Sequence, residues 1–140
     1  MDSQIREMYD APMSKFTYVR LYADEDGESH LEDVSVDLEL VDFAPPAPPV
    51  FVGGAQADTG VQFFQAPTGR DGKWHTSRKR QFMSILTGEF TGEVSDGEVR
   101  VFGTGSLLLL EDTTGTGHYT GTPNNSPNNS TLVTVLADQT

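Results

Sequence analysis

Two histidines, an aspartate and a tyrosine are the side chains of this sequence best suited to proton transfer. His75 follows Trp74, and His118 follows a Gly-Thr-Gly turn. Asp112 could accept a hydrogen bond from the N–H of either imidazole. This bond would fix the tautomer of that imidazole for general acid–base catalysis. Tyr119 could act as an acid. Each also has a structural interpretation: surface or strand histidines, an aspartate that caps the turn Asp-Thr-Thr-Gly, and a tyrosine that packs at a rim.

The alternation of side chains along β-strands predicts which residues share an interior with these groups. Half of the set is apolar and would form the cavity, and the other half is polar and would lie near its mouth. It consists of His75, Ser77, Gln81, Met83, Ile85, Leu108, Leu110 and Asp112. Small-molecule pockets are usually built in this way, and such a pocket suits an apolar or mixed ligand better than a phosphate.

The run Arg78-Lys79-Arg80 is the one basic cluster of an acidic chain. It could receive a carboxylate or phosphate group of a ligand. It could also be a solvated strand edge that deters sheet pairing, or an ion-pairing patch at a dimer contact. The acidic segment 24–33 is interpreted as a solvated loop, because it lacks the spacing of a calcium loop. The sequence contains no G-x-S-x-G elbow and no phosphate-binding glycine loop.

Short β-strands separated by turn residues would position these groups. Residues 34–40 alternate between apolar and polar, as in a half-buried antiparallel strand. Asp96-Gly97, between two β-rich runs, is a hairpin signature. Further strands are expected at 16–22, 60–66, 81–94, 98–102, 106–111, 118–121 and 131–137. Because no window has sustained helical periodicity, the sequence predicts an all-β sandwich or barrel.

The length of 140 residues predicts one domain over residues 16–140, preceded by a flexible N-terminal arm over residues 1–15. The proline-rich segment 44–49 lacks most backbone donors, so we expect it to cross between strands in an extended, polyproline-like conformation. A linker between two domains is disfavoured, because neither side of the segment is long enough to fold alone.

The composition argues against several classes of function. A net charge of −12 repels phosphate backbones and anionic lipid headgroups, so neither nucleic acid nor a membrane surface is an expected partner. The absence of cysteine excludes disulfides, thiolate metal sites and cysteine nucleophiles. No apolar run has the length of a membrane span. The first residues carry mixed charge and no apolar segment, so we expect no secretory signal and a cytoplasmic location.

Residues 72–118 resemble the two sequence motifs of small single-domain cupins. The run Phe82–Glu89 fits the pattern F-x-x-x-L-x-G-E, and GTG at 103–105 stands where the family usually has P-x-G. The run LLLEDTTGTGH at 108–118 is similar to a subgroup of cupin-domain proteins without an assigned reaction. The resemblance implies an antiparallel jelly-roll β-barrel. The resemblance also implies a homodimer that forms through the N-terminal strands.

Most of the cupin metal ligands are missing at the matching positions. These positions hold His75, Ser77, Gln81 and Leu108, so one ligand of four is retained. The resemblance therefore points to the metal-free cupins, and we expect no metal and no cofactor. An alternative ligand set of His75, Gln81, Asp112 and His118 would keep a metal for dioxygenase-type chemistry.

Three functions follow from these observations. The first is a metal-independent isomerase, epimerase or cyclase, for which secondary-metabolite tailoring or sugar modification would be natural settings. In this hypothesis His75 and His118 exchange protons, while Asp112 and Gln81 orient them. The substrate contacts would come from Ser77, Met83, Ile85, Leu108, Leu110 and Tyr119. The second function is a non-catalytic small-molecule-binding module, favoured by the small number of titratable groups in the interior. The third is the metal-dependent enzyme.

Overall fold

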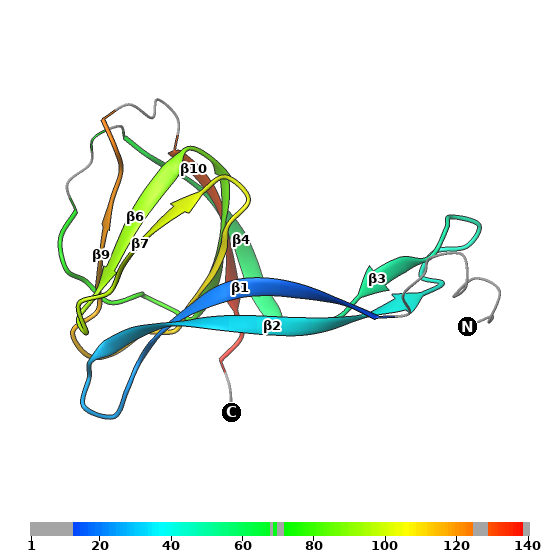
Figure 1. The fold of residues 1–140 in the computed structure, drawn as a ribbon, viewed down its shortest axis with the longest axis horizontal. Helices are drawn as coiled ribbons and strands as arrows, with labels where there is room; N and C mark the ends of the chain where they lie inside the picture. The colour runs from blue at the N-terminus through cyan, green and yellow to red at the C-terminus, as the bar shows by residue number, and fades with distance from the viewer. Residues whose placement is uncertain (1–12, 68, 70–71, 125–128, 139–140) are drawn as a thin grey trace. The chain divides into compact units, whose positions relative to one another are not determined.

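The computed structural model describes residues 13–67, 69, 72–124 and 129–138. These residues form β-strands and no helix, so the all-β prediction is confirmed (Figure 1). The strands are β1 (Met13–Ala23), β2 (Ser29–Val41), β3 (Val50–Val52), β4 (Asp58–Ala66), β5 (Gln81–Thr87), β6 (Glu89–Val94), β7 (Val99–Gly103), β8 (Leu107–Leu110), β9 (His118–Gly121) and β10 (Asn129–Leu136). Of the expected N-terminal arm, residues 1–12 lie outside the described residues, and Met13 begins β1.

The chain divides into two compact units, one of residues 1–17 and 34–56 and the other of residues 18–33 and 57–140. In the first unit β3 pairs antiparallel with β2, with Leu40 opposite Phe51. The alternation predicted along β2 is confirmed, since half-buried Val34, Val36 and Leu38 alternate with exposed polar residues.

The proline-rich segment 44–49 does not form the extended crossing expected from the sequence. The Ala47 amide donates to the Ala44 carbonyl at 2.9 Å, and the chain turns back on itself. The reason is the pairing on either side, where Val41 lies opposite Val50 and the connection between them must reverse direction. The prolines remain outside the strand ladder, as their missing N–H groups require.

The second unit contains two β-sheets, with strand orders β2-β1-β8-β5-β10-β4 and β7-β6-β9. The pairs β8–β5, β5–β10 and β10–β4 are antiparallel, whereas β1 and β8 are parallel. Two sheets of this kind fit the jelly-roll class predicted from the sequence. They are not joined into a closed barrel.

A glycine divides the single strand expected over residues 81–94. Gly88 has a φ of 81°, a conformation that favours glycine, and the chain passes there from β5 in the larger sheet to β6 in the smaller one. The hairpin predicted at Asp96-Gly97 is present and joins β6 to β7. Its turn is closed by the Gly97 amide, which donates to the Val94 carbonyl at 3.1 Å.

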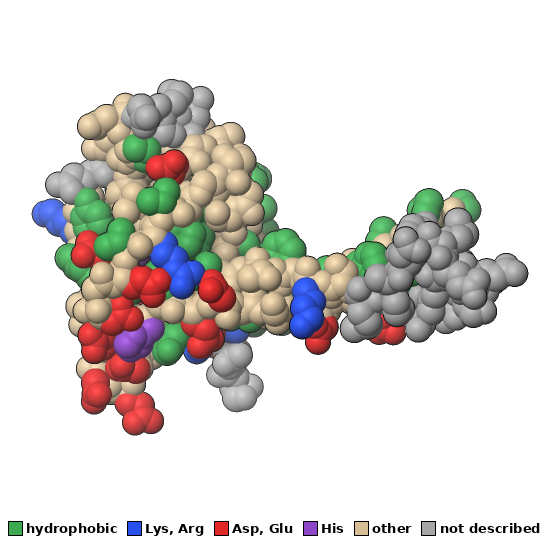
Figure 2. Space-filling model, viewed as in Figure 1, with side chains coloured by type: hydrophobic (Ala, Val, Ile, Leu, Met, Phe, Trp, Pro, Cys, Tyr) green, Lys and Arg blue, Asp and Glu red, His purple; other side chains and the backbone are tan. Residues whose placement is uncertain are grey.

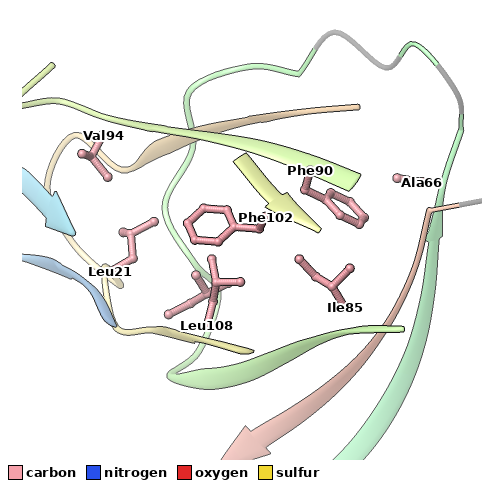
Figure 3. Packing of buried hydrophobic residues seen from close by; sticks show 8 residues of the cluster. Leu21, Ala66, Ile85, Phe90, Val94, Phe102 and Leu108 are labelled. Atoms are coloured by element: carbon pink, nitrogen blue, oxygen red, sulfur yellow. The ribbon is translucent and has the colours of Figure 1, made fainter. Parts of the chain in front are cut away.

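The hydrophobic core lies between the two sheets of the second unit. Figure 3 shows Phe90 and Phe102 of the smaller sheet facing Ile85 and Leu108 of the larger one. All four side chains are at most 5% exposed. Phe90 and Phe102 are directly opposed in the β6–β7 register, so the predicted hairpin places both rings on one face. Among the residues described, no helix has the length and apolar character needed to cross a membrane.

His30 bridges the acidic β1–β2 turn to the β6–β7 turn. Figure 2 shows acidic side chains gathered beside a histidine. His30 Nε2 lies 2.7 Å from Asp24 Oδ2, and His30 Nδ1 lies 2.8 Å from Asp96 Oδ2. The hydrogen bonds that His30 donates to Asp24 and then to Asp96 raise its pKa above the ordinary value of 6.5. The pKa of Asp24 is lowered, chiefly by His30, and the pKa of Asp96 by the Glu98 amide and then by His30.

We expect this bridge to make stability depend on pH. Because the folded-state pKa of His30 is raised, its contribution is complete below about pH 6.5 and is lost as the pH rises through that raised pKa. The carboxylates have lowered pKa values, so their contribution is lost only under acid conditions, below 3.8. Urea denaturation of wild type and His30→Gln should therefore differ most near about pH 5–6 and converge towards about pH 9. A difference that does not change with pH would contradict the assignment.

Candidate functional site

The second unit contains a cavity of about 900 Å³ between its two sheets. Its apolar wall includes Leu21, Met83, Phe90, Phe102, Leu108 and Leu110. Polar side chains are concentrated on the segment 75–79 that precedes β5, and include His75 and Ser77. His118, the first residue of β9, lies beside them in the cavity wall. Cavities of this size and composition are typical of small-molecule sites.

A buried hydrogen-bonded network supports the imidazole of His118. His118 Nδ1–H donates to Asp112 Oδ2 at 2.6 Å, and Ser77 Oγ–H donates to Asp112 Oδ1 at 2.7 Å. Asp112 is completely buried, and Ser77 and His118 are at most 5% exposed. The Ser77 amide also donates to the Asp112 carbonyl at 3.1 Å. Because a carboxylate only accepts, this arrangement places the His118 proton on Nδ1 and leaves Nε2 as the acceptor.

His75 is held next to His118 by the backbone. The amide of each histidine donates to the carbonyl of the other, at 3.0 and 2.9 Å. Their rings lie 4.7 Å apart between centroids and are tilted by 53°. His75 Nδ1 donates to the Lys73 carbonyl at 2.7 Å, so its Nε2 is also an acceptor. Neither Nε2 atom has a hydrogen-bond partner among the described residues.

Two adjacent imidazoles with Nε2 as the acceptor can each take a proton, and each can return one only after its Nε2 has been protonated. A neutral His118 can take a proton at Nε2, and the imidazolium that forms would be stabilised by the negative charge of Asp112. Ser77 donates to the other oxygen of the Asp112 carboxylate and so restricts its orientation. His75 lies on the more exposed side and could exchange protons with solvent.

The structure brings together most of the residues that the sequence predicts for the site. His75, Ser77, Gln81, Met83, Leu108, Leu110 and His118 line the cavity, and Asp112 lies behind His118. The inward alternation along β5 and β8 is therefore present, with Gln81 opposite Leu110 and Met83 opposite Leu108.

Two predicted contact residues do not line the cavity. Ile85 belongs to the hydrophobic core, where Figure 3 shows it facing Phe90. Tyr119 alternates with His118 and Thr120, which both line the cavity, so its side chain points away from it. The tyrosine is half-buried and has interactions elsewhere in the structure.

The cavity wall that β4 contributes was not predicted from the sequence. Val61, Gln62, Phe64 and Gln65 line the cavity, although every residue of β4 before Ala66 is exposed. Their alternation is weak, since apolar and polar side chains occur on both faces of the strand. Its place in the wall follows from pairing with β10 over its length, a long-range contact that no local sequence pattern specifies.

The basic cluster divides between two environments. Arg80 and Arg20 both donate to the carboxylate of Glu111, with the Arg20 contact at 2.5 Å. Burial alone would raise the pKa of Glu111, but the hydrogen bonds from Arg80 and Arg20 outweigh it and the pKa is lowered. Arg78 and Lys79 are exposed and line the cavity instead.

The alternative metal-ligand set does not converge on one point. Within the described part of the chain, three His, Asp or Glu ligand atoms lie within 4.8 Å of one another only at Asp24, Glu28 and His30. Both oxygens of Asp112 face Ser77 and His118, so the carboxylate supports the imidazole rather than pointing into the cavity. At the acidic turn, both nitrogens of His30 already bond to carboxylates.

Fold and site together define an all-β protein with a mixed apolar and polar cavity and a paired-histidine wall. No protein family model matches the sequence, and no curated protein does. The chain is similar in structure to a candidate ethanolamine utilization protein Q of Salmonella typhimurium LT2. The two share 17% sequence identity over 89% of this chain and 99% of the other, with a TM-score of 0.44. A match of this kind carries no information on function.

Proposed function

We propose that this protein is a metal-independent acid–base enzyme that acts on a small organic molecule inside its cavity. The observation that carries the proposal is the buried Ser77–Asp112–His118 network in the cavity wall. Asp112 has no exposed surface, and a buried carboxylate is costly unless it is used or paired. Here one of its oxygens accepts from the His118 imidazole, which lines the cavity, and the other accepts from Ser77.

The reaction class that suits these groups is proton removal at one atom and proton return at another. His118, positioned by Asp112, would be the first proton acceptor, and His75 would exchange the second proton. Isomerisation, epimerisation and cyclisation all have this form, and none requires an external oxidant. Gln81, half-buried at the start of β5, would orient a carbonyl or hydroxyl group of the substrate. Holding the substrate in the apolar cavity would contribute by proximity and orientation.

Deuterium exchange tests this proposal across a panel of candidate substrates. Carbonyl compounds and sugars incubated with the protein in D₂O would be followed by NMR for deuterium incorporation and rearrangement. We expect at least one compound to exchange with wild type, and a His75→Gln, His118→Gln double variant to be slower by about 10²–10⁴-fold. The matched control is His30→Gln, which removes the third histidine, outside the cavity, and should leave the rate unchanged.

A non-catalytic binding module is the second candidate. Among the described residues that line the cavity, histidine, arginine and lysine are the only titratable types. A compound that raises the melting temperature, without exchange or conversion in any member of the panel, would favour binding alone. An exchange rate that is unchanged in the double histidine variant would exclude the proposed proton-transfer role.

A further inference from the structure

Four of the seven described cations pair with carboxylates, in a chain where 21 acidic residues accompany nine basic ones. In the described residues Lys15, Arg20, Arg80 and Arg100 all form ion pairs. Lys73, Arg78 and Lys79 form none with any described residue. All three lie within one seven-residue segment that also contains His75 and Ser77. Three cations without carboxylate partners in so short a segment require an explanation in a chain with a net charge of −12.

The cavity lining has the opposite charge to the rest of the protein. Arg78 and Lys79 line it, and no described Asp or Glu does. A cleft that carries one sign of charge between low-dielectric walls concentrates the field inside it. The remainder of the wall is apolar or uncharged, with Phe90, Phe102 and Leu108 on its apolar side. The cavity therefore offers a cationic region and an apolar region to the same ligand.

We infer that the ligand of this cavity is an amphipathic organic carboxylate, whose carboxylate binds Arg78 and Lys79 and whose apolar body packs against the phenylalanine and leucine wall. The inference rests on the proposed function in that it concerns the same cavity. It narrows the substrate class to organic acids.

A carboxylate fits these groups better than a phosphate. The planar guanidinium of Arg78 matches a carboxylate with two parallel hydrogen bonds, and Lys79 adds a point charge. A phosphate dianion usually needs several backbone N–H groups from a glycine-rich loop, and the sequence contains no such loop. The net charge of −12 also opposes a dianion more strongly than a monoanion.

The position of the cations also links binding to chemistry. Residues 75–79 carry His75, the buried Ser77 and both cations on five consecutive positions. Two hydrogen bonds from Ser77 to Asp112, one from its hydroxyl and one from its amide, fix the middle of this segment. A carboxylate bound at 78–79 would therefore be held by the same short segment of the cavity wall that carries His75.

Titration calorimetry with matched acids and amides tests the inference. The probes are arylalkanoates from phenylacetate to phenylhexanoate, their primary amides, and the corresponding arylalkyl phosphates. We expect at least one carboxylate to bind wild type about tenfold more tightly than its amide, and the preference to weaken as salt rises. In the Arg78→Gln, Lys79→Gln double variant the acid and amide should bind equally. The matched control Lys73→Gln removes an unpaired cation outside the cavity lining and should keep the preference.

Several results would overturn the inference. These are equal binding of every acid and amide to wild type, preference for the phosphate over the carboxylate, and an acid preference that persists in the double variant. Loss of the preference in Lys73→Gln would indicate general charge attraction instead. The His75→Gln, His118→Gln variant separates the two proposals. If this variant still prefers the acid over the amide and wild type turns over no compound, the ligand class is supported and the enzyme proposal fails.

Discussion

Replacing Asp112 with asparagine will lower the turnover of any exchanging substrate by about 10²–10⁴-fold while the fold is retained. The change is nearly isosteric and leaves one acceptor oxygen, but it removes the negative charge that stabilises a protonated His118. The asparagine can also present its NH₂ group to the ring, which would place the His118 proton on Nε2 and block the acceptor. Steady-state kinetics of the exchange reaction gives the size of the loss. Nitrogen NMR of the histidine ring reports the tautomer.

The neighbouring carboxylate provides the control for this prediction. Glu111→Gln makes the same chemical change one residue away, where the side chain bonds to Arg20 and Arg80 and not to a histidine. It should lower stability without changing the tautomer of His118 or the turnover. Turnover of Asp112→Asn within about twofold of wild type would show that the buried carboxylate has only a structural role.

Local features of the fold were predictable from the sequence. The hairpin at Asp96-Gly97 follows from turn chemistry, and the alternation along β2 follows from one half-buried face. Both depend on residues close together in the chain. The parallel pairing of β1 with β8 does not, because Val19 and Leu108 come from distant parts of the sequence and no local pattern specifies their register. Gly88 was missed because a single glycine within a β-rich run does not reveal that the chain changes sheets.

The candidate site was predictable to the extent that strand alternation holds. Alternation places Gln81 and Met83 in the cavity wall, but it cannot tell where core packing replaces the cavity, as it does at Ile85. The sequence suggested that Asp112 could orient either histidine. His118, six residues from Asp112, makes that bond, whereas His75 Nδ1 bonds to the Lys73 carbonyl. What no local pattern shows is the isolated bridge between residues 75 and 118, which brings the two histidines together from segments more than forty residues apart.

Replacing Gly117 with alanine should destabilise the protein by about 2–5 kcal/mol, the sum of left-handed backbone strain and overpacking. Gly117 has a φ of 81°, and a Cβ there would lie 2.2 Å from the His75 carbonyl oxygen. This carbonyl accepts the His118 amide at 2.9 Å, so the backbone that holds the two imidazoles together must move. Urea denaturation followed by circular dichroism measures the loss of stability.

Gly105→Ala separates the two costs, because Gly105 has a φ of 92° but nothing within 4 Å of its added Cβ. It should cost only the backbone strain, about 1–2 kcal/mol, and leave exchange activity unchanged. Gly117→Ala should lose activity even under conditions where it is fully folded, since the clash displaces His75 from His118. If both variants lose equal stability and both retain activity, the paired backbone bonds of residues 75 and 118 do not position the catalytic groups. The proposed proton transfer would then have to depend on His118 and Asp112 alone.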